Sequence, residues 1–163
     1  MPVSLEREGL PAEAGAGVDF EALAHLICGG ELGAEPLVSL LLCDDARIAE
    51  INAEWLGHQG PTDVISFPQW ELTPGGGRQA GGSVPDLLGD IVISVETAAR
   101  QAADWPAPWS ADHELALLFV HGLLHLLGYD DLAAPARAQM RAREDHWLAA
   151  AGWGPVPREE DTP

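Results

Sequence analysis

The segment from Ser110 to Gly128 constrains the fold more than any other part of this chain. It reads SADHELALLFVHGLLHLLG and holds the longest apolar stretch that suits a helix. Ser110 is a favourable N-cap, and Gly128 is the residue type that most readily takes the left-handed conformation with which helices end. We predict that the longest apolar helix of the protein ends near Leu127 and carries His121 and His125.

Shorter patterns around this helix alternate between strand and helix. β-Branched or apolar runs that end at turn residues predict strands near 3–6, 37–43, 62–67 and 89–94. Further helices are expected at about 20–28, 45–56, 95–104 and 135–150, with Gly29 and Gly30 ending the first. The expected N-caps are Asp19, Asp44, Ser94 and Ser110. This order predicts one α/β (α+β) domain, a small mixed four-stranded sheet flanked by about five helices.

The length of 163 residues suits a single domain. We assign residues 1–152 to it and expect 153–163 to be a disordered tail. No apolar stretch approaches the roughly 18 to 20 residues of a membrane span, and the start, MPVSLEREGL, lacks the features of a secretory signal. We therefore expect a soluble, cytoplasmic protein with no membrane partner, in which Cys28 and Cys43 are buried free thiols.

Acidic residues far outnumber basic ones. The chain has 26 Asp and Glu residues against 8 basic residues, all of them arginine, and a net charge of −18. Non-specific binding of nucleic acid depends on Lys and Arg that neutralise phosphates, so such a surface as a whole repels a polyanion. Any nucleic-acid function must therefore rest on a local site.

The two histidines of the long helix are spaced for a shared metal ion. Residues four apart differ by only about 40° around a helix axis, so His121 and His125 point the same way. An isolated pair of this kind is more often structural than metal-binding. Here Gly128 can end the helix and turn the chain back, which allows Asp131 to return as a third ligand. Asp130 is the rival third ligand, and the register favours Asp131.

The long zincin signature has the same spacing but places a glutamate, the general base, directly after its first histidine. That position is Gly122 in this chain, which disfavours a peptidase. The prediction is a zincin-like metal helix with three protein ligands and an open position for water or a substrate oxygen.

Three segments resemble motifs of the YbeY family. HGLLHLLGYDD is similar to the family's HGxLHLxGYDH, PTDVISFP to PT(D/N)VLSFP, and LGDIVIS to LGDIVI, in the same order along the chain. The resemblance implies a metal-dependent, single-strand-specific endoribonuclease that acts in 16S rRNA 3′-end maturation and ribosome quality control. It also implies one Zn²⁺ held by three histidines, and ribosomal RNA, the small ribosomal subunit and ribosomal or assembly-factor proteins as partners.

Asp131 stands where the family has its third histidine, so only His121 and His125 match the ligands in type. A carboxylate oxygen binds zinc well, and two histidines with a carboxylate also suit iron or manganese. The added negative charge makes bound water less acidic and the approach of a phosphate less favourable.

Leu56 stands where many family members carry an arginine that is thought to serve RNA cleavage. His58 and Arg47 are the candidates to replace this cation, although a solvated surface position is the commoner one for each. The missing arginine and the altered ligand support a second hypothesis, a ribosome-associated binding factor with a structural metal and little nuclease activity.

Asp90 in LGDIVIS is the candidate catalytic residue. It either orients a metal-binding histidine or binds substrate, and the alternative is a hydrogen bond at the end of a strand. Thr62, Asp63 and Ser66 either contact RNA or have turn and strand-cap roles. Glu114 shares the helix face of His121, but an exposed position in the first turn of the helix is expected for it, and the same holds for His113.

Overall fold

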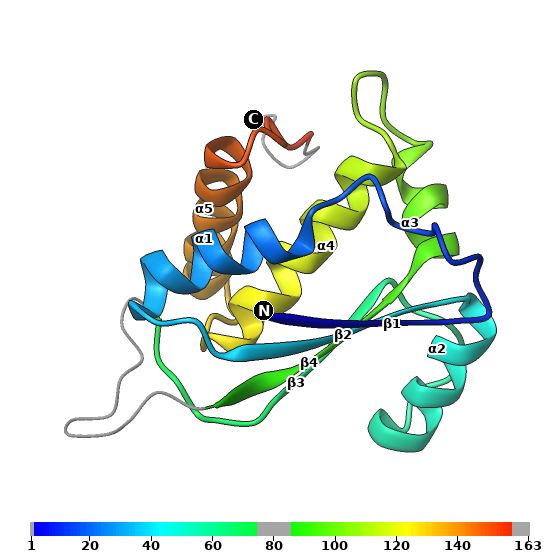
Figure 1. Ribbon diagram of the computed structural model, residues 1–163, viewed down its shortest axis with the longest axis horizontal. Coiled ribbons are helices and arrows are strands. Elements are labelled where there is room, and N and C mark those ends of the chain that lie inside the picture. Colours follow the sequence, from blue (N-terminus) through cyan, green and yellow to red (C-terminus); the bar gives the residue numbers. More distant parts are fainter. Residues whose placement is uncertain (1, 75–85, 158–163) are drawn as a thin grey trace.

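The computed structural model describes residues 2–74 and 86–157. In this part of the chain one four-stranded sheet has the order β1-β2-β4-β3. The first three of these strands run parallel, and β3 is antiparallel to β4. Their bounds are Val3–Glu8 for β1, Leu37–Cys43 for β2, Val64–Pro68 for β3 and Leu87–Ser94 for β4. The predicted small mixed sheet is confirmed (Figure 1).

The α-helices of the described residues are α1 Phe20–Leu32, α2 Asp45–Ile51, α3 Val95–Ala102, α4 Ala111–Leu126 and α5 Ala134–Ala150, and a π-helical turn, Asn52–Leu56, continues α2. Four of them begin at N-caps that the sequence predicts. In each case the side chain accepts a hydrogen bond from the backbone N–H three residues later, as at Ser110, which accepts from His113. These caps satisfy N–H groups that a helix leaves without partners at its start.

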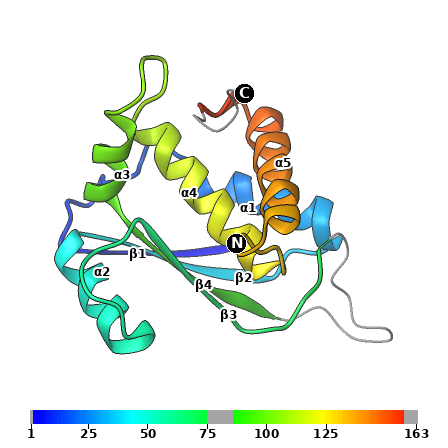
Figure 2. The same cartoon turned by 180° about the vertical axis from the view of Figure 1, so that it is seen from behind.

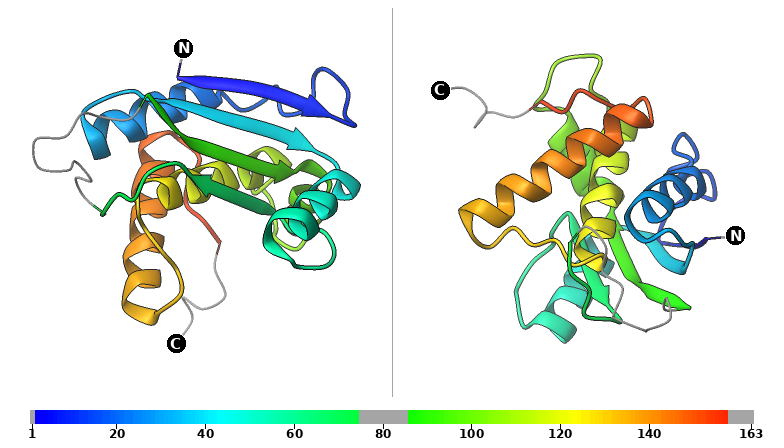
Figure 3. Two further views of the ribbon diagram at one scale, coloured as in Figure 1. Left: turned by 90° about the horizontal axis from the view of Figure 1, so that it is seen from below. Right: turned by 90° about the vertical axis from the view of Figure 1, so that its left-hand side faces the viewer.

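The helices form a layer on each face of the sheet, as Figures 1 and 2 show from opposite sides. Helices α1 and α4 cover one face, with α5 packed on α4, and α2 lies against the other face (Figure 3). Strand β2 shows the reason, because Val38, Leu40 and Leu42 alternate toward the main core and are fully buried or nearly so. A smaller core, with Ile48 and Val92, lies under α2.

Gly122 lets the central helix α4 lie directly on the sheet. A Cβ at this position would come within 2.9 Å of Cγ2 of Ile91 on β4. A glutamate, which a zincin peptidase requires here, would therefore have to push α4 away from the sheet. The sequence argument against a peptidase thus gains a steric reason.

The prediction that Gly29 and Gly30 end the first helix is wrong. Helix α1 continues to Leu32 and ends at Gly33, whose φ of 69° is left-handed and whose N–H donates to the carbonyl of Gly29. A Cβ on Gly30 would overlap the indole of Trp147 on α5. This glycine therefore serves the close packing of α1 against α5.

Trp55 does not share the buried face of Ile48 and Ile51, as a continuous α-helix would predict. The wider π-helical turn over Asn52–Leu56 changes the phase of the helix, so Trp55 is 67% exposed while Asn52 is buried. The side-chain amide of Asn52 donates to the carbonyl of Gly60 at 3.0 Å and holds the following loop.

Trp153 and Val156, in the segment expected to begin a disordered tail, pack against the main core. Trp153 donates its backbone N–H to the carbonyl of Leu148 at 2.8 Å, and its ring meets that of His113 edge-on. The rest of the predicted tail, 158–163, lies outside the described residues. Within the described ranges, no helix combines the length and the apolar character that crossing a bilayer requires.

Candidate metal centre

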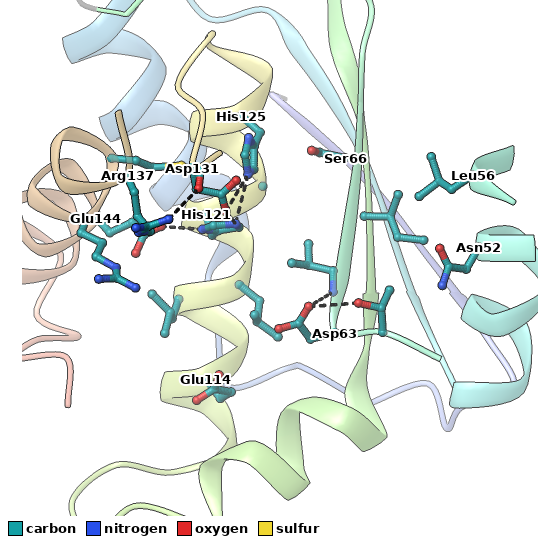
Figure 4. Close-up of a pocket in the computed structure, with 18 of the residues that line it drawn as sticks. Asn52, Leu56, Asp63, Ser66, Glu114, His121, His125, Asp131, Arg137 and Glu144 are labelled. Atoms are coloured by element: carbon teal, nitrogen blue, oxygen red, sulfur yellow. Dashed lines mark hydrogen bonds and ion pairs between the residues drawn. The ribbon is translucent and has the colours of Figure 1, made fainter. Parts of the chain in front are cut away.

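Three side chains converge beside the C-terminal half of α4 (Figure 4). The Nε2 atoms of His121 and His125 are 3.1 Å apart. Oδ2 of Asp131 lies 3.5 Å from the first and 3.7 Å from the second. The structure thus brings together the three residues that the sequence predicts as metal ligands.

The end of α4 explains how Asp131 reaches the histidines. Gly128 has a φ of 101°, its N–H donates to the carbonyl of His125, and the N–H of Tyr129 donates to that of Leu124. These two hydrogen bonds form a Schellman motif, which stops the helix and reverses the chain. Asp130 does not join this group. Its exposed carboxylate accepts a hydrogen bond from the N–H of Leu132 at 2.8 Å.

Each histidine is held through its Nδ1 atom. His121 donates from Nδ1 to the buried carboxylate of Glu144 at 2.6 Å, and His125 donates from Nδ1 to the carbonyl of Tyr129 at 3.1 Å. When both rings are neutral, each Nε2 atom then directs a lone pair toward Asp131. Such outer partners fix the tautomer and the ring orientation of histidines that bind metals.

The donor set fits a divalent metal ion. Two imidazole lone pairs and a carboxylate oxygen face one another, and only a positive charge between them relieves their repulsion. With metal–ligand bonds of about 2.0 to 2.2 Å, two ligands of a tetrahedral zinc lie about 3.3 to 3.6 Å apart. The observed separations of 3.1, 3.5 and 3.7 Å bracket this value.

The pKa values of the two histidines move in opposite directions. Burial favours neutral His121, but the hydrogen bond and charge of Glu144 outweigh it and raise the pKa. Burial and the neighbouring His121 lower the pKa of His125. In the metal-free protein, a proton on His121 can therefore supply the positive charge that the three ligands require.

Glu144 holds the imidazole of His121, a role for which the sequence offered Asp90 as a candidate. Asp90 lies on β4 in a separate hollow beside Phe67 and Arg47, and it does not line the cleft of the histidines. Glu144 is buried on the same face of α5 as Met140, Trp147 and Leu148. A single glutamate among apolar residues on one helix face was the sequence pattern that could have identified it.

We expect Glu144→Ala to weaken metal binding about 10- to 100-fold, because the buried Nδ1–H of His121 loses its acceptor. Glu144→Gln keeps an oxygen acceptor and most of the packing but loses the charge, so its effect should be smaller. Competition with a chromophoric zinc chelator measures both affinities. Equal affinities for the parent and Glu144→Ala would contradict this role.

The candidate metal centre lies in the wall of an open cleft of about 580 Å³. Figure 4 shows Leu56 and Asn52 on the side opposite Asp131 and Glu144. His58 also lines the cleft, whereas Arg47 faces the other hollow, where it pairs with Glu8 and Glu50. Of the two candidates to replace the missing arginine, only His58 is near the metal centre.

Two arginines that the sequence analysis did not single out, Arg137 and Arg141, line the cleft from α5. Thr62, Asp63 and Ser66 line the facing side. Asp63 accepts from the N–H of Val64 at 2.7 Å, in keeping with a turn role.

Glu114 is buried rather than exposed, contrary to expectation. It is 6% exposed, and Nε1 of Trp109 donates to it at 2.8 Å. Burial raises its pKa against the opposing effect of that hydrogen bond. His113 completes a capping box with Ser110, so its role at the start of α4 is structural.

Glu114→Gln should stabilise the protein at neutral pH. In the unfolded chain the carboxyl ionises near pH 4.3 or so, whereas the folded state resists ionisation, so the parent loses stability as pH rises above that value. Near pH 3 both states carry a neutral acid and the advantage should vanish. Urea unfolding at the two pH values tests this, and an equal gain at both would contradict the burial explanation.

The fold and the site together define a class: a small α+β protein with a zincin-like helix and a three-ligand group, suited to a metal ion, in the wall of an open cleft. The comparisons with known proteins narrow this class. The chain belongs to the endoribonuclease YbeY family, whose model matches residues 20–152. The resemblance found in the motifs is thereby confirmed.

Sequence identity to curated proteins of this family supports the same assignment. Endoribonuclease YbeY of Mycobacterium tuberculosis is 49% identical over 111 residues, which cover 68% of this chain and 62% of that protein. The protein of the same name from Corynebacterium efficiens is 46% identical over 138 residues, covering 82% and 68%. The matched region thus spans about 62% of the length of the mycobacterial relatives.

A solved structure shows the same fold. The solution structure of TM1509 from Thermotoga maritima matches with a TM-score of 0.59 and 20% identity, covering 99% of each chain. At this identity the match supports the architecture of the sheet and its helices.

Proposed function

We propose that this protein is a metal-dependent, single-strand-specific endoribonuclease that acts in 16S rRNA 3′-end maturation and ribosome quality control. Membership of the YbeY family supports the proposal. The observation that carries it is the convergence of His121, His125 and Asp131 in the wall of an open cleft. Ribosomal RNA in the small subunit is the proposed substrate, ribosomal or assembly-factor proteins are the proposed partners, and the cytoplasm is the proposed location.

In this proposal His121, His125 and Asp131 hold one Zn²⁺, with iron or manganese as alternatives because a carboxylate replaces the third histidine. A divalent ion in this position supplies Lewis acidity toward a phosphoryl oxygen and lowers the pKa of water. Glu144 and the carbonyl of Tyr129 keep the two imidazoles in the tautomer that binds the ion. Hydrolysis adds water across one phosphorus–oxygen bond of the strand.

A ribosome-associated binding factor with little nuclease activity is the second candidate. One observation favours it: Leu56, 44% exposed, lines the cleft where the family resemblance leads us to expect an arginine. Without that cation, the developing charge on the phosphate has less stabilisation from this side of the cleft.

The deciding experiment compares purified, zinc-loaded parent and His121→Ala on single-stranded and double-stranded RNA of one sequence. The proposal expects cleavage of the single strand by the parent alone. If the parent and the variant both leave the single strand intact, the nuclease proposal fails. Co-sedimentation of this inactive protein with small ribosomal subunits would then support the binding factor.

A further inference from the structure

Helix α5 presents two arginines to the cleft beside the metal centre. Arg137 and Arg141 both line the cleft, and residues four apart share one face of a helix. Figure 4 shows Arg137 next to Asp131. The guanidinium of Arg137 meets the carbonyl of Asp131 at 3.5 Å, a long contact that engages one of its five N–H donors.

The other described arginines lie outside this cleft. Arg7 donates to the carbonyl of Ala14, Arg47 pairs with Glu8, and Arg100 pairs with Asp45. Arg143 also lies on α5 but pairs with buried Glu31 on α1. Of the arginines on α5, Arg143 thus binds to α1, whereas Arg137 and Arg141 line the cleft.

This placement matters because of the charge of the whole chain. At a net charge of −18, a polyanion is repelled by most of the surface, so a strand can bind only where cations are gathered. The carboxylate of Asp131 adds a negative charge to the metal centre itself. Guanidinium groups bind phosphate oxygens through paired N–H donors, and they keep their charge at every relevant pH.

We infer that Arg137 and Arg141 bind the phosphate backbone of a single strand in the cleft, and so provide from α5 the positive charge that is missing at Leu56. The inference rests on the proposed function for its substrate. Glu144, three residues after Arg141, holds His121. The same helix thus fixes the phosphate contacts relative to the metal ligands.

The test uses Arg137→Gln/Arg141→Gln and a matched control, Arg47→Gln/Arg100→Gln, which makes the same change in net charge outside the cleft. The probe is a single-stranded deoxyoligonucleotide, which has the phosphates of RNA but no 2′-hydroxyl. Its binding to each zinc-loaded protein is measured between about 50 and 200 mM salt, where each phosphate contact on a single strand contributes about 0.7 to the slope of log affinity against log salt.

The cleft variant should bind the probe at least about tenfold more weakly and lose about 1.4 from the slope, while the control keeps the slope of the parent. Arg137→Lys/Arg141→Lys should recover most of the slope, since it retains both charges. Metal content and far-ultraviolet circular dichroism should match the parent in all variants. For a cleft variant that fails to fold, the lysine variant and each single glutamine variant provide the same comparison.

The outcomes separate the inference from the proposed function. An unchanged slope in the cleft variant overturns the inference, even if the parent cleaves RNA. A reduced slope together with a parent that leaves RNA uncut supports the phosphate site while the nuclease proposal fails. If both hold, the cleft variant should also raise the KM for single-stranded RNA at least about tenfold.

Discussion

Asp131→Ala is expected to reduce the metal content from about one ion per chain to nearly none after dialysis against a weak chelator. Only the two histidines remain as protein ligands in this variant. Loss of a residue that only hydrogen-bonds to a metal ligand lowers metal affinity about 10- to 100-fold, and loss of a ligand itself should lower it further. Elemental mass spectrometry on protein purified without added metal measures the content and identifies the ion.

Two further variants sharpen this experiment. Asp131→His restores the residue type that the family signature has here, so it should retain the metal and favour zinc over iron or manganese. Asp130→Ala should retain the metal, because that carboxylate only accepts the N–H of Leu132. Full metal content in Asp131→Ala would show that the third ligand lies elsewhere. No metal in the parent would contradict a three-ligand site.

The second large effect is expected in stability, from Glu31→Ala. The side chain of Glu31 is 3% exposed, and its carboxylate accepts hydrogen bonds from Tyr129, Arg143 and Trp147 at 2.8 to 3.0 Å. Burial opposes its charge, but these donors outweigh burial and lower its pKa. Removing Glu31 leaves the hydroxyl of Tyr129 and the indole N–H of Trp147 as buried donors without an acceptor, which costs about 1 to 3 kcal/mol for each, and it deprives the partly exposed Arg143 of its counterion.

Urea unfolding monitored by circular dichroism measures this loss. Glu35→Ala is the control, since Glu35 is half exposed and pairs with His25 at the surface. Its free energy of unfolding should stay within about 0.5 kcal/mol of the parent. A similar small effect for Glu31→Ala would show that the network adds little to stability.

The Glu31 network also connects stability to the metal centre. Tyr129 donates its hydroxyl to Glu31, while its backbone carbonyl accepts from Nδ1 of His125. Arg143 and Trp147 attach α5, which carries Glu144, to α1. We therefore expect folded Glu31→Ala to bind zinc more weakly than the parent, although Glu31 touches none of the proposed ligands.

The sequence by itself determined the features that depend on neighbours in the chain. Ser110 caps α4 because its side chain needs to reach only the next turn. His121 and His125 share a face by helix geometry, and Gly128 reverses the chain within the same motif, so the convergence of these histidines with Asp131 was predictable from local spacing. The sheet followed from short apolar runs between turn residues.

Only the tertiary structure decided which residues from distant elements support the site. Glu144 is 23 positions from His121, and Glu31 is 98 from Tyr129. Asp90 lies in the other hollow because alternate residues of β4 face opposite sides of the sheet. Pairing across such separations depends on which face each helix and strand turns inward, and packing of the whole chain sets that choice.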